Sequence, residues 1–247
     1  MLDVRTENGI DEVIFNRPDK RNALTTEMLE ELAGAAARST ARCILLRGEG
    51  ARFCAGFDLT ACREQPHALG DLLEDLSKAV RALRRAGPPV VIAAHGAAIA
   101  GGCALLAGGD FVVTDRDAKI GYPVVTLGIS PAVSGPSLVR VTNDRRARER
   151  MLNPSLVSGE DALRVGLVSH CEATPEEAIG KARELAAMLA SKPPVALQRT
   201  RAWIDEIAGE FDDRPYDAAL NASMNLVGGD EERERLARIW NREGKNS

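Results

Sequence analysis

The sequence predicts an α/β fold, because strand and helix signals alternate along its first half and helix signals dominate from residue 137 onward. Short apolar runs of strand length occur at residues 13–15, 43–46 and 90–94. Between these runs, apolar residues recur at the spacing of an amphipathic helix. Strands that alternate with helices pair in parallel, because a helical crossover returns the chain to the same end of the sheet. We therefore expect a parallel sheet covered by helices.

The elements of the first half follow in order. A strand at residues 13–15 precedes a helix over 26–38, whose first turns carry glutamates, which are favourable near a helix N-terminus. A buried strand at 43–46 comes next, and a second helix is expected over 69–86. The residues of its apolar face are Leu72, Leu73, Leu76, Val80 and Leu83.

The segment 90–107 carries no Asp, Glu, Lys or Arg and is close to the minimum length of a membrane span. However, His95-Gly96 and Gly101-Gly102 interrupt it with residues that favour turns. We predict a buried strand, a turn and a buried helix here, followed by a strand at 111–113, and no membrane association.

Helix signals dominate the second half. Ser158 with Asp161, and Thr174 with Glu177, have the spacing of a capping box, which begins a helix. Pro175 fits the first helical position, where its missing N–H costs nothing. The remaining helices are expected over residues 195–207, 216–226 and 231–240.

The length of 247 residues suits one large domain with a small appendage. We expect a core over residues 1–194 and a C-terminal helical region over residues 195–247. The formal net charge of −4 argues against nucleic-acid binding, which normally needs a basic surface. The arginine-rich run between residues 140 and 150 is interpreted as a solvated helix face.

The cysteines and histidines favour a cytoplasmic protein without a metal site. Five cysteines lack the Cys-x-x-Cys spacing, and an odd number suggests free thiols in a reducing compartment. Three histidines lie far apart in the sequence and predict no metal cluster. The N-terminal residues 1–5 lack the apolar core of a signal peptide.

The glycines near residues 56 and 101 suggest a site built from backbone amides. Glycine has no Cβ, so a ligand is able to approach the main chain closely. If Gly101 begins a helix, its N–H has no partner within that helix. A second N–H from the Gly56-Phe57 turn would complete a pair, and two donors aimed at one carbonyl oxygen form an oxyanion hole.

Other glycine-dependent motifs are excluded by the residues around them. Gly48-Glu49-Gly50 begins like a dinucleotide-binding loop, but Phe53 stands where the third glycine is required. Gly96 and Gly101 have the spacing of a phosphate-binding loop, but Gly102-Cys103 replace its Lys and Ser/Thr. The sequence contains no Gly-x-Ser-x-Gly, so the nucleophile elbow of a hydrolase is not supported.

Four segments, in this order, resemble the signature segments of the crotonase superfamily, also called the enoyl-CoA hydratase/isomerase family. They are Arg17–Leu24, Phe53–Leu59, Pro89–Asp110 and Ser158–Val168. Each segment is moderately specific by itself, and the four together identify the family. The similarity extends over residues 2–240.

The resemblance implies a crotonase-like ββα spiral with a C-terminal helical trimerisation region. It implies a homotrimer or a hexamer, and a role in fatty acid metabolism with lyase or isomerase chemistry. Coenzyme A is expected as part of an acyl-CoA substrate, and no permanently bound cofactor is expected. Apolar residues of the C-terminal helices suit either a subunit interface or the cover of the core. These residues are Leu220, Met224, Leu226, Leu236, Ile239 and Trp240.

The resemblance also implies the residues of the site. The backbone N–H groups of Phe57 and Gly101 correspond to the catalytic donors of the oxyanion hole. Main-chain groups around Ala23 and Ala55 correspond to contacts with the nucleotide and pantetheine parts of coenzyme A. The remaining positions are Lys20 or Arg21 beside the phosphates, and Asp58, Leu59, Ala104 and Val124 against the substrate.

The chain departs from the family at the two glutamates with which hydratases handle water and protons. Ala104 and Val124 stand at these positions, and neither side chain carries a proton that it can exchange. General acid–base groups commonly contribute about 10²–10⁴-fold to a rate, so the replacement argues against ordinary hydration. Glu64 and His67 are the preferred substitutes, because their loop borders the acyl pocket in the family. Structural roles are the preferred interpretation for Asp58, Cys62, Tyr122, Ser130 and Ser134.

Two functions remain open. The first is an enzyme of altered chemistry that stabilises a thioester enolate in the oxyanion hole formed by Phe57 and Gly101. The second is a non-catalytic acyl-CoA carrier or sensor, since Ala104 and Val124 suit a hydrocarbon chain better than water. An RNA-binding relative of the fold is disfavoured by the acidic net charge.

Overall fold

A six-stranded sheet forms the centre of the computed structural model, which describes residues 1–63, 65 and 67–243. The strand order is β1-β2-β3-β4-β6-β8, and every neighbouring pair except β1 and β2 is parallel. The bounds are β1 Leu2–Glu7, β2 Ile10–Phe15, β3 Cys43–Gly48, β4 Val90–Ala93, β6 Phe111–Asp115 and β8 His170–Glu172. The predicted α/β class and parallel pairing are therefore confirmed.

Strands β1 and β2 form an antiparallel hairpin that was not predicted from the sequence. Its turn consists of Asn8 and Gly9, whose φ angles are 52° and 78°. An Asn-Gly pair favours this left-handed turn, because both residues tolerate positive φ. The hairpin adds an antiparallel edge to an otherwise parallel sheet.

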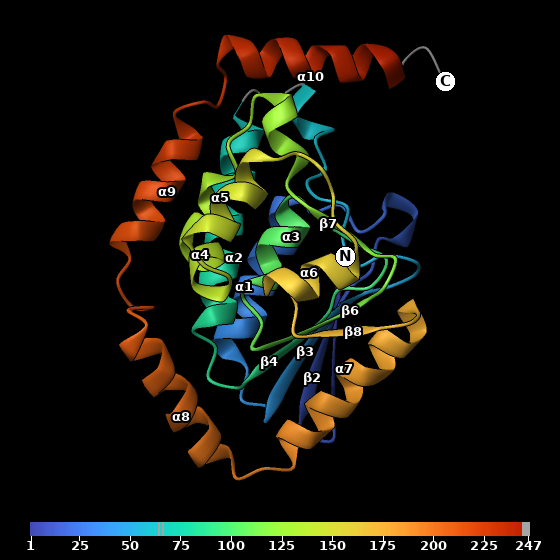
Figure 1. Ribbon diagram of the computed structural model, residues 1–247, viewed down its shortest axis with the longest axis vertical. Helices are drawn as coiled ribbons and strands as arrows, with labels where there is room; N and C mark the ends of the chain where they lie inside the picture. Colours follow the sequence, from blue (N-terminus) through green and yellow to red (C-terminus); the bar gives the residue numbers. More distant parts are fainter. Residues whose placement is uncertain (64, 66, 244–247) are drawn as a thin grey trace.

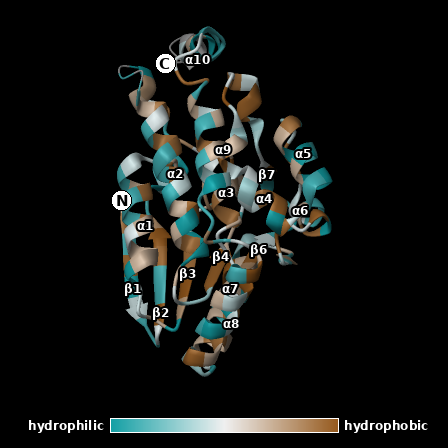
Figure 2. Cartoon of the chain, turned by 90° about the vertical axis from the view of Figure 1, so that its left-hand side faces the viewer, coloured by the Kyte–Doolittle hydropathy of each residue, from teal (hydrophilic) through white to brown (hydrophobic). Residues whose placement is uncertain are grey.

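Both faces of the central strands β3 and β4 are buried, and successive residues of a strand point to opposite faces. On β3, Ile44 and Leu46 pack against the larger core, whereas Leu45 faces the second core. Helices α1 (Thr26–Arg38) and α2 (Ala68–Arg84) cover the first face. Helix α7 (Pro175–Ala190) covers the other face, against β3, β4 and β6. Figure 2 shows that the central strands form a continuous hydrophobic layer between these helices.

A second, two-stranded parallel sheet turns the chain towards the candidate site. It pairs β5 (Ala97–Ile99) with β7 (Lys119–Gly121), and helix α3 (Gly101–Leu106) follows β5. The bend between β4 and β5 requires glycine, because Gly96 has a φ of 66° and a Cβ there would lie 2.1 Å from the Ala51 oxygen. The segment 90–107 is thus strand, turn, short strand and helix, and the separate β5 was not predicted. Among the described residues, no helix has the length and apolar character needed to cross a membrane.

The predicted helix starts of the second half are confirmed. The Ser158 hydroxyl accepts the Asp161 N–H at the start of α6 (Gly159–Val165). The Thr174 hydroxyl accepts the Glu177 N–H at the start of α7, with Pro175 at its first position. Between β7 and α6, the chain forms the 3₁₀ turns η3 (Pro123–Leu127) and η4 (Pro131–Ser134) and then two helices. These helices are α4 Gly135–Val141 and α5 Asp144–Leu152.

The last three helices pass around the outside of the core (Figure 1). They are α8 Pro194–Ile207, α9 Arg214–Met224 and α10 Asp230–Glu243. Arg201 attaches α8 to the core, because its buried guanidinium lies 2.8 Å from the Asp110 carboxylate and 2.9 Å from the Leu83 oxygen. Helix α8 begins beside the expected boundary at residue 194.

The apolar faces predicted for the C-terminal helices have different surroundings. Leu236 is buried, and Leu220 and Trp240 pack partly against the core. Met224 and Leu226 are 37% and 46% exposed. The side chain of Ile239 lies outside the described residues.

Candidate active site

The two predicted amide donors lie where an extended segment meets the start of α3. Phe57 pairs with Leu24 in a parallel bridge. In this bridge, the Leu24 N–H donates to the Gly56 oxygen, and the Asp58 N–H donates to the Leu24 oxygen. Amides alternate in direction along an extended segment, so the Phe57 N–H points away from Leu24. Gly101 is the first residue of α3. Within the described chain, neither the Phe57 nor the Gly101 N–H has a hydrogen-bond acceptor.

Glycine at residue 101 allows these segments to approach each other. A Cβ on Gly101 would lie 3.0 Å from Cε1 of Phe57, and one on Gly102 would lie 2.8 Å from Cβ of Cys54. The approach is fixed by backbone pairing, since the Cys54 N–H donates to the Ala97 oxygen at 2.9 Å. The glycines thus serve close packing and leave an amide free at the same time.

Ala100, directly before the helix, has a strained backbone. Its φ is 53° and its ψ is −113°, a conformation that L-residues rarely adopt. Such strain costs about 1–3 kcal/mol and persists only where surrounding contacts impose it. Here the Ala100 N–H donates to the Gly121 oxygen at 2.8 Å. This contact fixes the direction in which the next amide, that of Gly101, points.

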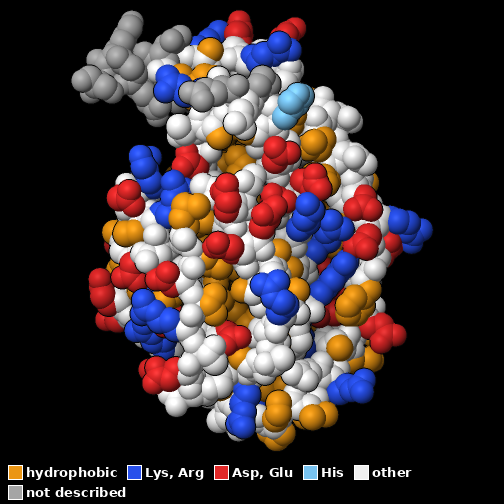
Figure 3. Space-filling model, turned by 180° about the vertical axis from the view of Figure 1, so that it is seen from behind, with side chains coloured by type: hydrophobic (Ala, Val, Ile, Leu, Met, Phe, Trp, Pro, Cys, Tyr) orange, Lys and Arg blue, Asp and Glu red, His pale blue; other side chains and the backbone are white. Residues whose placement is uncertain are grey.

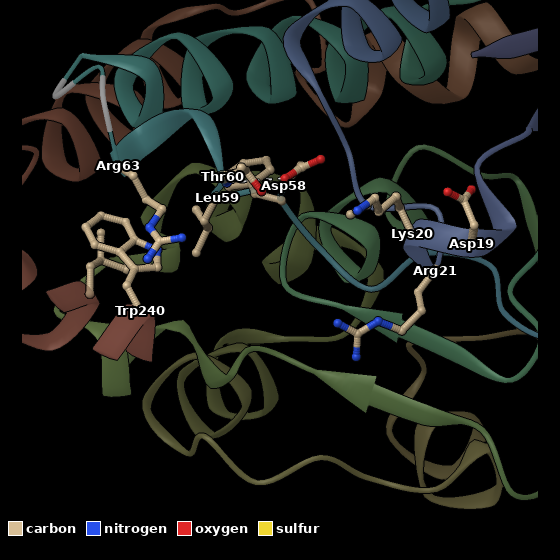
Figure 4. A pocket seen from close by; sticks show the side chains of 11 residues that line it. Asp19, Lys20, Arg21, Asp58, Leu59, Thr60, Arg63 and Trp240 are labelled. Atoms are coloured by element: carbon tan, nitrogen blue, oxygen red, sulfur yellow. Dashed lines mark hydrogen bonds between the residues drawn. The ribbon is translucent and has the colours of Figure 1, made fainter. Parts of the chain in front are cut away.

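A cavity of about 480 Å³, the outer cavity, opens beside Phe57. Its lining consists of residues 19–21, 23 and 57–60, with Arg63, Leu236 and Trp240. Figure 4 shows Lys20 and Arg21 on one side and Arg63 beside Trp240 on the other. The Arg63 guanidinium carbon lies 5.7 Å from the Trp240 ring centroid, a cation–π distance. The outer cavity therefore combines several cations with an aromatic surface.

A second, much smaller space lies on the inner side of Phe57. This inner cavity of about 20 Å³ is bounded by Phe57, Ala100 and Gly101, by Leu73 and Leu76 of α2, and by residues between 122 and 134. Within the described part of the chain, every side chain that lines it is uncharged. Phe57 lines both cavities, so this residue lies between them.

The other predicted substrate-binding residues lie in different places: some line the outer cavity, one lines the inner cavity, and others line neither. Ala23, Asp58 and Leu59 line the outer cavity, and Val124 lines the inner one. Ala104 is 1% exposed within the core and lines neither cavity. The remaining position, Ala55, donates its N–H to the Arg21 oxygen at 3.1 Å.

Asp58 is engaged with its own loop, as the sequence analysis expected for a structural role. Its carboxylate accepts hydrogen bonds from Arg17 at 2.9 Å and from the Thr60 N–H at 3.2 Å. Burial acts to raise the pKa of Asp58, but these hydrogen bonds and the Arg17 charge hold that pKa below its usual value. Asp58 is therefore ionised at neutral pH.

Two residues that were not predicted support segments of the outer-cavity lining. Asn22 is fully buried, and its amide donates to the Glu49 and Arg52 oxygens at 2.9 and 2.7 Å. Arg17 links Asp58 to the Ala23 oxygen. Asn22 and Arg17 both belong to the first signature segment, which was the available signal. No local signal placed Trp240 opposite Arg63, because these residues meet only through folding.

Of the two substitutes preferred for the missing carboxylates, His67 does not line the inner cavity. Glu64 lies outside the described residues. His67 and Cys62 line another cavity, together with Glu232 and Trp240. Burial raises the pKa of the Cys62 thiol to about 11, which keeps it protonated.

The hydroxyl residues near the missing acid do reach the inner cavity. Tyr122, Ser130 and Ser134 all line it. The Ser130 hydroxyl caps the turn η4 by accepting the Ala132 N–H at 3.2 Å, as expected for a structural role.

Known proteins with similar sequences belong to the enoyl-CoA hydratase/isomerase family. The family model described as enoyl-CoA hydratase/isomerase matches residues 5–224. The chain is 34% identical over 217 residues to a putative enoyl-CoA hydratase of Thermus thermophilus, covering 83% of this chain and 85% of that protein. It is 33% identical over 202 residues to the 1,2-epoxyphenylacetyl-CoA isomerase of Escherichia coli, covering 77% and 76%.

Solved structures share the fold along nearly the whole chain. An enoyl-CoA hydratase/isomerase from Mycobacterium paratuberculosis superposes with a TM-score of 0.84 at 25% identity, covering 96% of this chain and 97% of that one. The fold is accordingly that of the crotonases, with a C-terminal helical region. The chain belongs to the enoyl-CoA hydratase/isomerase family of the crotonase superfamily.

Proposed function

We propose that this protein binds an acyl-CoA thioester with the carbonyl oxygen between the N–H groups of Phe57 and Gly101. Family membership supports an acyl-CoA-processing function. The observation that carries the proposal is the position of Phe57 at the junction of two unlike cavities. The cationic outer cavity suits the phosphates and nucleotide of coenzyme A, and the apolar inner cavity suits an acyl chain.

The chemistry that fits these donors is the formation of a thioester enolate. Transfer of a proton from the carbon next to the thioester, to water or to another group of the substrate, places negative charge on the carbonyl oxygen. Two amides held in place stabilise that charge more strongly than the neutral ground state, because they need no reorganisation during the reaction. Such a donor typically contributes about 10²–10³-fold to the rate.

Ordinary hydration is not the reaction that we propose. Val124 stands at one family glutamate position and lines the inner cavity, while Ala104 stands at the other and is buried in the core. Neither side chain orients water or transfers a proton. We therefore infer an enzyme of lyase or isomerase type with altered proton handling, acting in fatty acid metabolism.

A non-catalytic acyl-CoA carrier or sensor is the second candidate. It is favoured by the uncharged lining of the inner cavity within the described chain. A carrier needs an apolar acyl site and oriented amides but no acid or base. The two candidates differ in one measurable property, namely whether bound acyl-CoA exchanges its α-protons.

The decisive experiment combines binding with proton exchange. The purified protein is titrated with butyryl-CoA by calorimetry, and α-proton exchange in D₂O is followed by mass spectrometry. Binding with exchange supports the enzyme, and binding without exchange supports the carrier. Absence of binding refutes both. In parallel, hydration of crotonyl-CoA at ordinary hydratase rates, followed by loss of the conjugated absorbance, would refute the inference of altered chemistry.

We further propose a homotrimer or a hexamer, with α8 in the interface. Its exposed apolar residues are the support, because large exposed apolar patches commonly mark interaction sites. On and just after α8, these residues are Val195, Trp203, Ile204, Ile207 and Phe211, each at least 49% exposed in the single chain. Light scattering coupled to gel filtration tests this proposal, and a monomer across micromolar concentrations would refute it.

A further inference from the structure

Tyr122, a residue of the inner-cavity lining, has a buried hydroxyl that makes no hydrogen bond within the described residues. The residue is 2% exposed and lines the inner cavity together with Phe57 and Gly101. Buried tyrosine hydroxyls usually find a partner, because burying an unpaired polar group is costly.

The only other tyrosine in the sequence, Tyr216, shows the usual arrangement. Its hydroxyl donates to the Glu210 carboxylate at 2.5 Å and accepts a hydrogen bond from Arg140 at 3.0 Å. The two tyrosines are similarly buried, yet within the described residues only the Tyr216 hydroxyl makes well-formed hydrogen bonds. The Tyr122 hydroxyl, which lies near Cys103 and Ser134, therefore remains available to a ligand oxygen.

The backbone holds Tyr122 in register with the amide donors. Gly121, directly before it, accepts the Ala100 N–H at 2.8 Å, and Ala100 directly precedes Gly101. A single hydrogen bond thus connects the residues that precede Tyr122 and Gly101. An acyl chain whose carbonyl oxygen meets the Gly101 amide would enter the cavity that Tyr122 lines.

Tyr122 is a hydrogen-bond donor over the whole physiological pH range. Its hydroxyl lies near the Cys103 thiol and the Ser134 hydroxyl. Burial raises the pKa of Tyr122 well above 10, and the adjacent Cys103 acts in the same direction. A neutral phenol in an apolar wall favours a neutral acceptor, such as a carbonyl or ether oxygen.

The size of the inner cavity limits the acyl group. A space of about 20 Å³ holds approximately one water-sized group. Leu73, Leu76 and Val133 close its walls. Few atoms beyond the thioester carbon are accommodated without displacing them.

We propose that Tyr122 selects short acyl-CoA substrates that carry an oxygen acceptor on the first carbons of the acyl chain. This inference rests on the proposed acyl-CoA site. The Tyr122 hydroxyl donates to the substrate oxygen while Phe57 and Gly101 donate to the thioester oxygen. Tyr122 therefore determines specificity in a cavity whose described lining is uncharged.

The test compares two ligands of equal length, acetoacetyl-CoA and butyryl-CoA, by calorimetry. We expect the wild type to bind acetoacetyl-CoA more tightly. Y122F should weaken acetoacetyl-CoA binding by about 2- to 10-fold, the effect of losing one neutral hydrogen bond, and should leave butyryl-CoA binding unchanged. Hexanoyl-CoA should bind more weakly than butyryl-CoA.

A matched control removes another buried hydroxyl. Ser77 on α2 is 2% exposed, its hydroxyl also lacks a partner in the described chain, and it does not line the inner cavity. S77A should leave the preference between the two ligands unchanged. Y122F should also keep the wild-type unfolding temperature, because no internal hydrogen bond is lost.

The results distinguish a failure of the proposed acyl-CoA site from a failure of the proposed role of Tyr122. If the wild type binds neither ligand, the proposed acyl-CoA site is wrong. If it binds both and Y122F changes neither affinity, or changes both equally, the site stands and the role of Tyr122 is wrong. Hexanoyl-CoA binding as tightly as butyryl-CoA would overturn the limit on chain length.

Discussion

The Asp58 carboxylate lies 2.9 Å from the Arg17 guanidinium, and this ion pair joins the loop of the first amide donor to the segment before α1. Arg17 uses a second nitrogen to reach the Ala23 oxygen at 2.7 Å. The pair thereby fixes Phe57, the residue before Asp58, relative to the wall of the outer cavity. Asp58, which directly follows Phe57, therefore holds the loop in position and is not itself a donor to the substrate.

Replacing Asp58 should reduce stability in a pH-dependent way. D58N should lower the free energy of unfolding at pH 7 by about 1–2 kcal/mol, because hydrogen bonds to a charged group are lost in a partly exposed site. The folded-state pKa of Asp58 lies below its ordinary value of 3.8, so its contribution is complete above that value. The contribution disappears as the pH falls through the folded-state pKa. Urea unfolding at pH 7 and at successively lower pH measures the difference.

The exposed Asp117 provides the control for this prediction. D117N should change the unfolding free energy little at any of these pH values. A difference between D58N and wild type that grows on acidification would contradict the assigned direction.

Removing the Gly101 amide should abolish most enolate stabilisation. Proline fits the first position of a helix, so G101P removes the N–H with a compatible φ. G101A is the matched variant, because it adds a Cβ that also meets Phe57 but keeps the N–H. We expect α-proton exchange in butyryl-CoA to be about 10²–10³-fold slower in G101P than in G101A. Equal rates in two folded variants would exclude this amide as a donor.

Neutralising the cations of the outer cavity should weaken coenzyme A binding. Lys20 and Arg21 line that cavity, and charged hydrogen bonds to phosphates are stronger than neutral ones. The double variant K20A/R21A should bind coenzyme A about 10-fold more weakly, equivalent to about 1.4 kcal/mol. Its affinity should also depend less on salt, because fewer charges contribute. K192A, which removes an exposed lysine outside the outer cavity, should behave as wild type in the same titrations.

Introducing a carboxylate at residue 124 should confer hydration activity. Val124 lines the inner cavity, so V124E would place an acid–base group beside the acyl chain. We expect crotonyl-CoA hydration to rise at least about 10-fold, because such groups contribute 10²–10⁴-fold in favourable geometry. V124Q adds the same bulk without an ionisable group and should show no gain. A gain in both variants would assign the effect to cavity shape instead.

The surface seen in Figure 3 is not uniformly basic, as the net charge of −4 suggested. Figure 3 shows acidic and basic side chains interspersed over the face seen there. The prediction of a solvated helix face is confirmed for Arg145, Arg146 and Arg148, which are exposed, but is wrong for Arg150, which is buried and pairs with Glu149.

The sequence by itself determined the local elements and the family. The helix over residues 26–38 was predicted with its observed bounds, and the caps at Ser158 and Thr174 formed as expected. These features depend on neighbours in the chain, such as a hydroxyl three residues before an amide. The start of a helix at Gly101 was also predicted from neighbouring residues in the chain.

Only the tertiary structure decided which side chains share a cavity. It placed His67 and Cys62 away from the inner cavity, buried Ala104 in the core, and brought Tyr122 beside Gly101. Cavities arise where distant segments pack imperfectly, and their linings depend on contacts between residues far apart in the chain. The proposed amide pair was predicted from local glycines and turns, whereas the side chains that share its cavity follow from long-range packing.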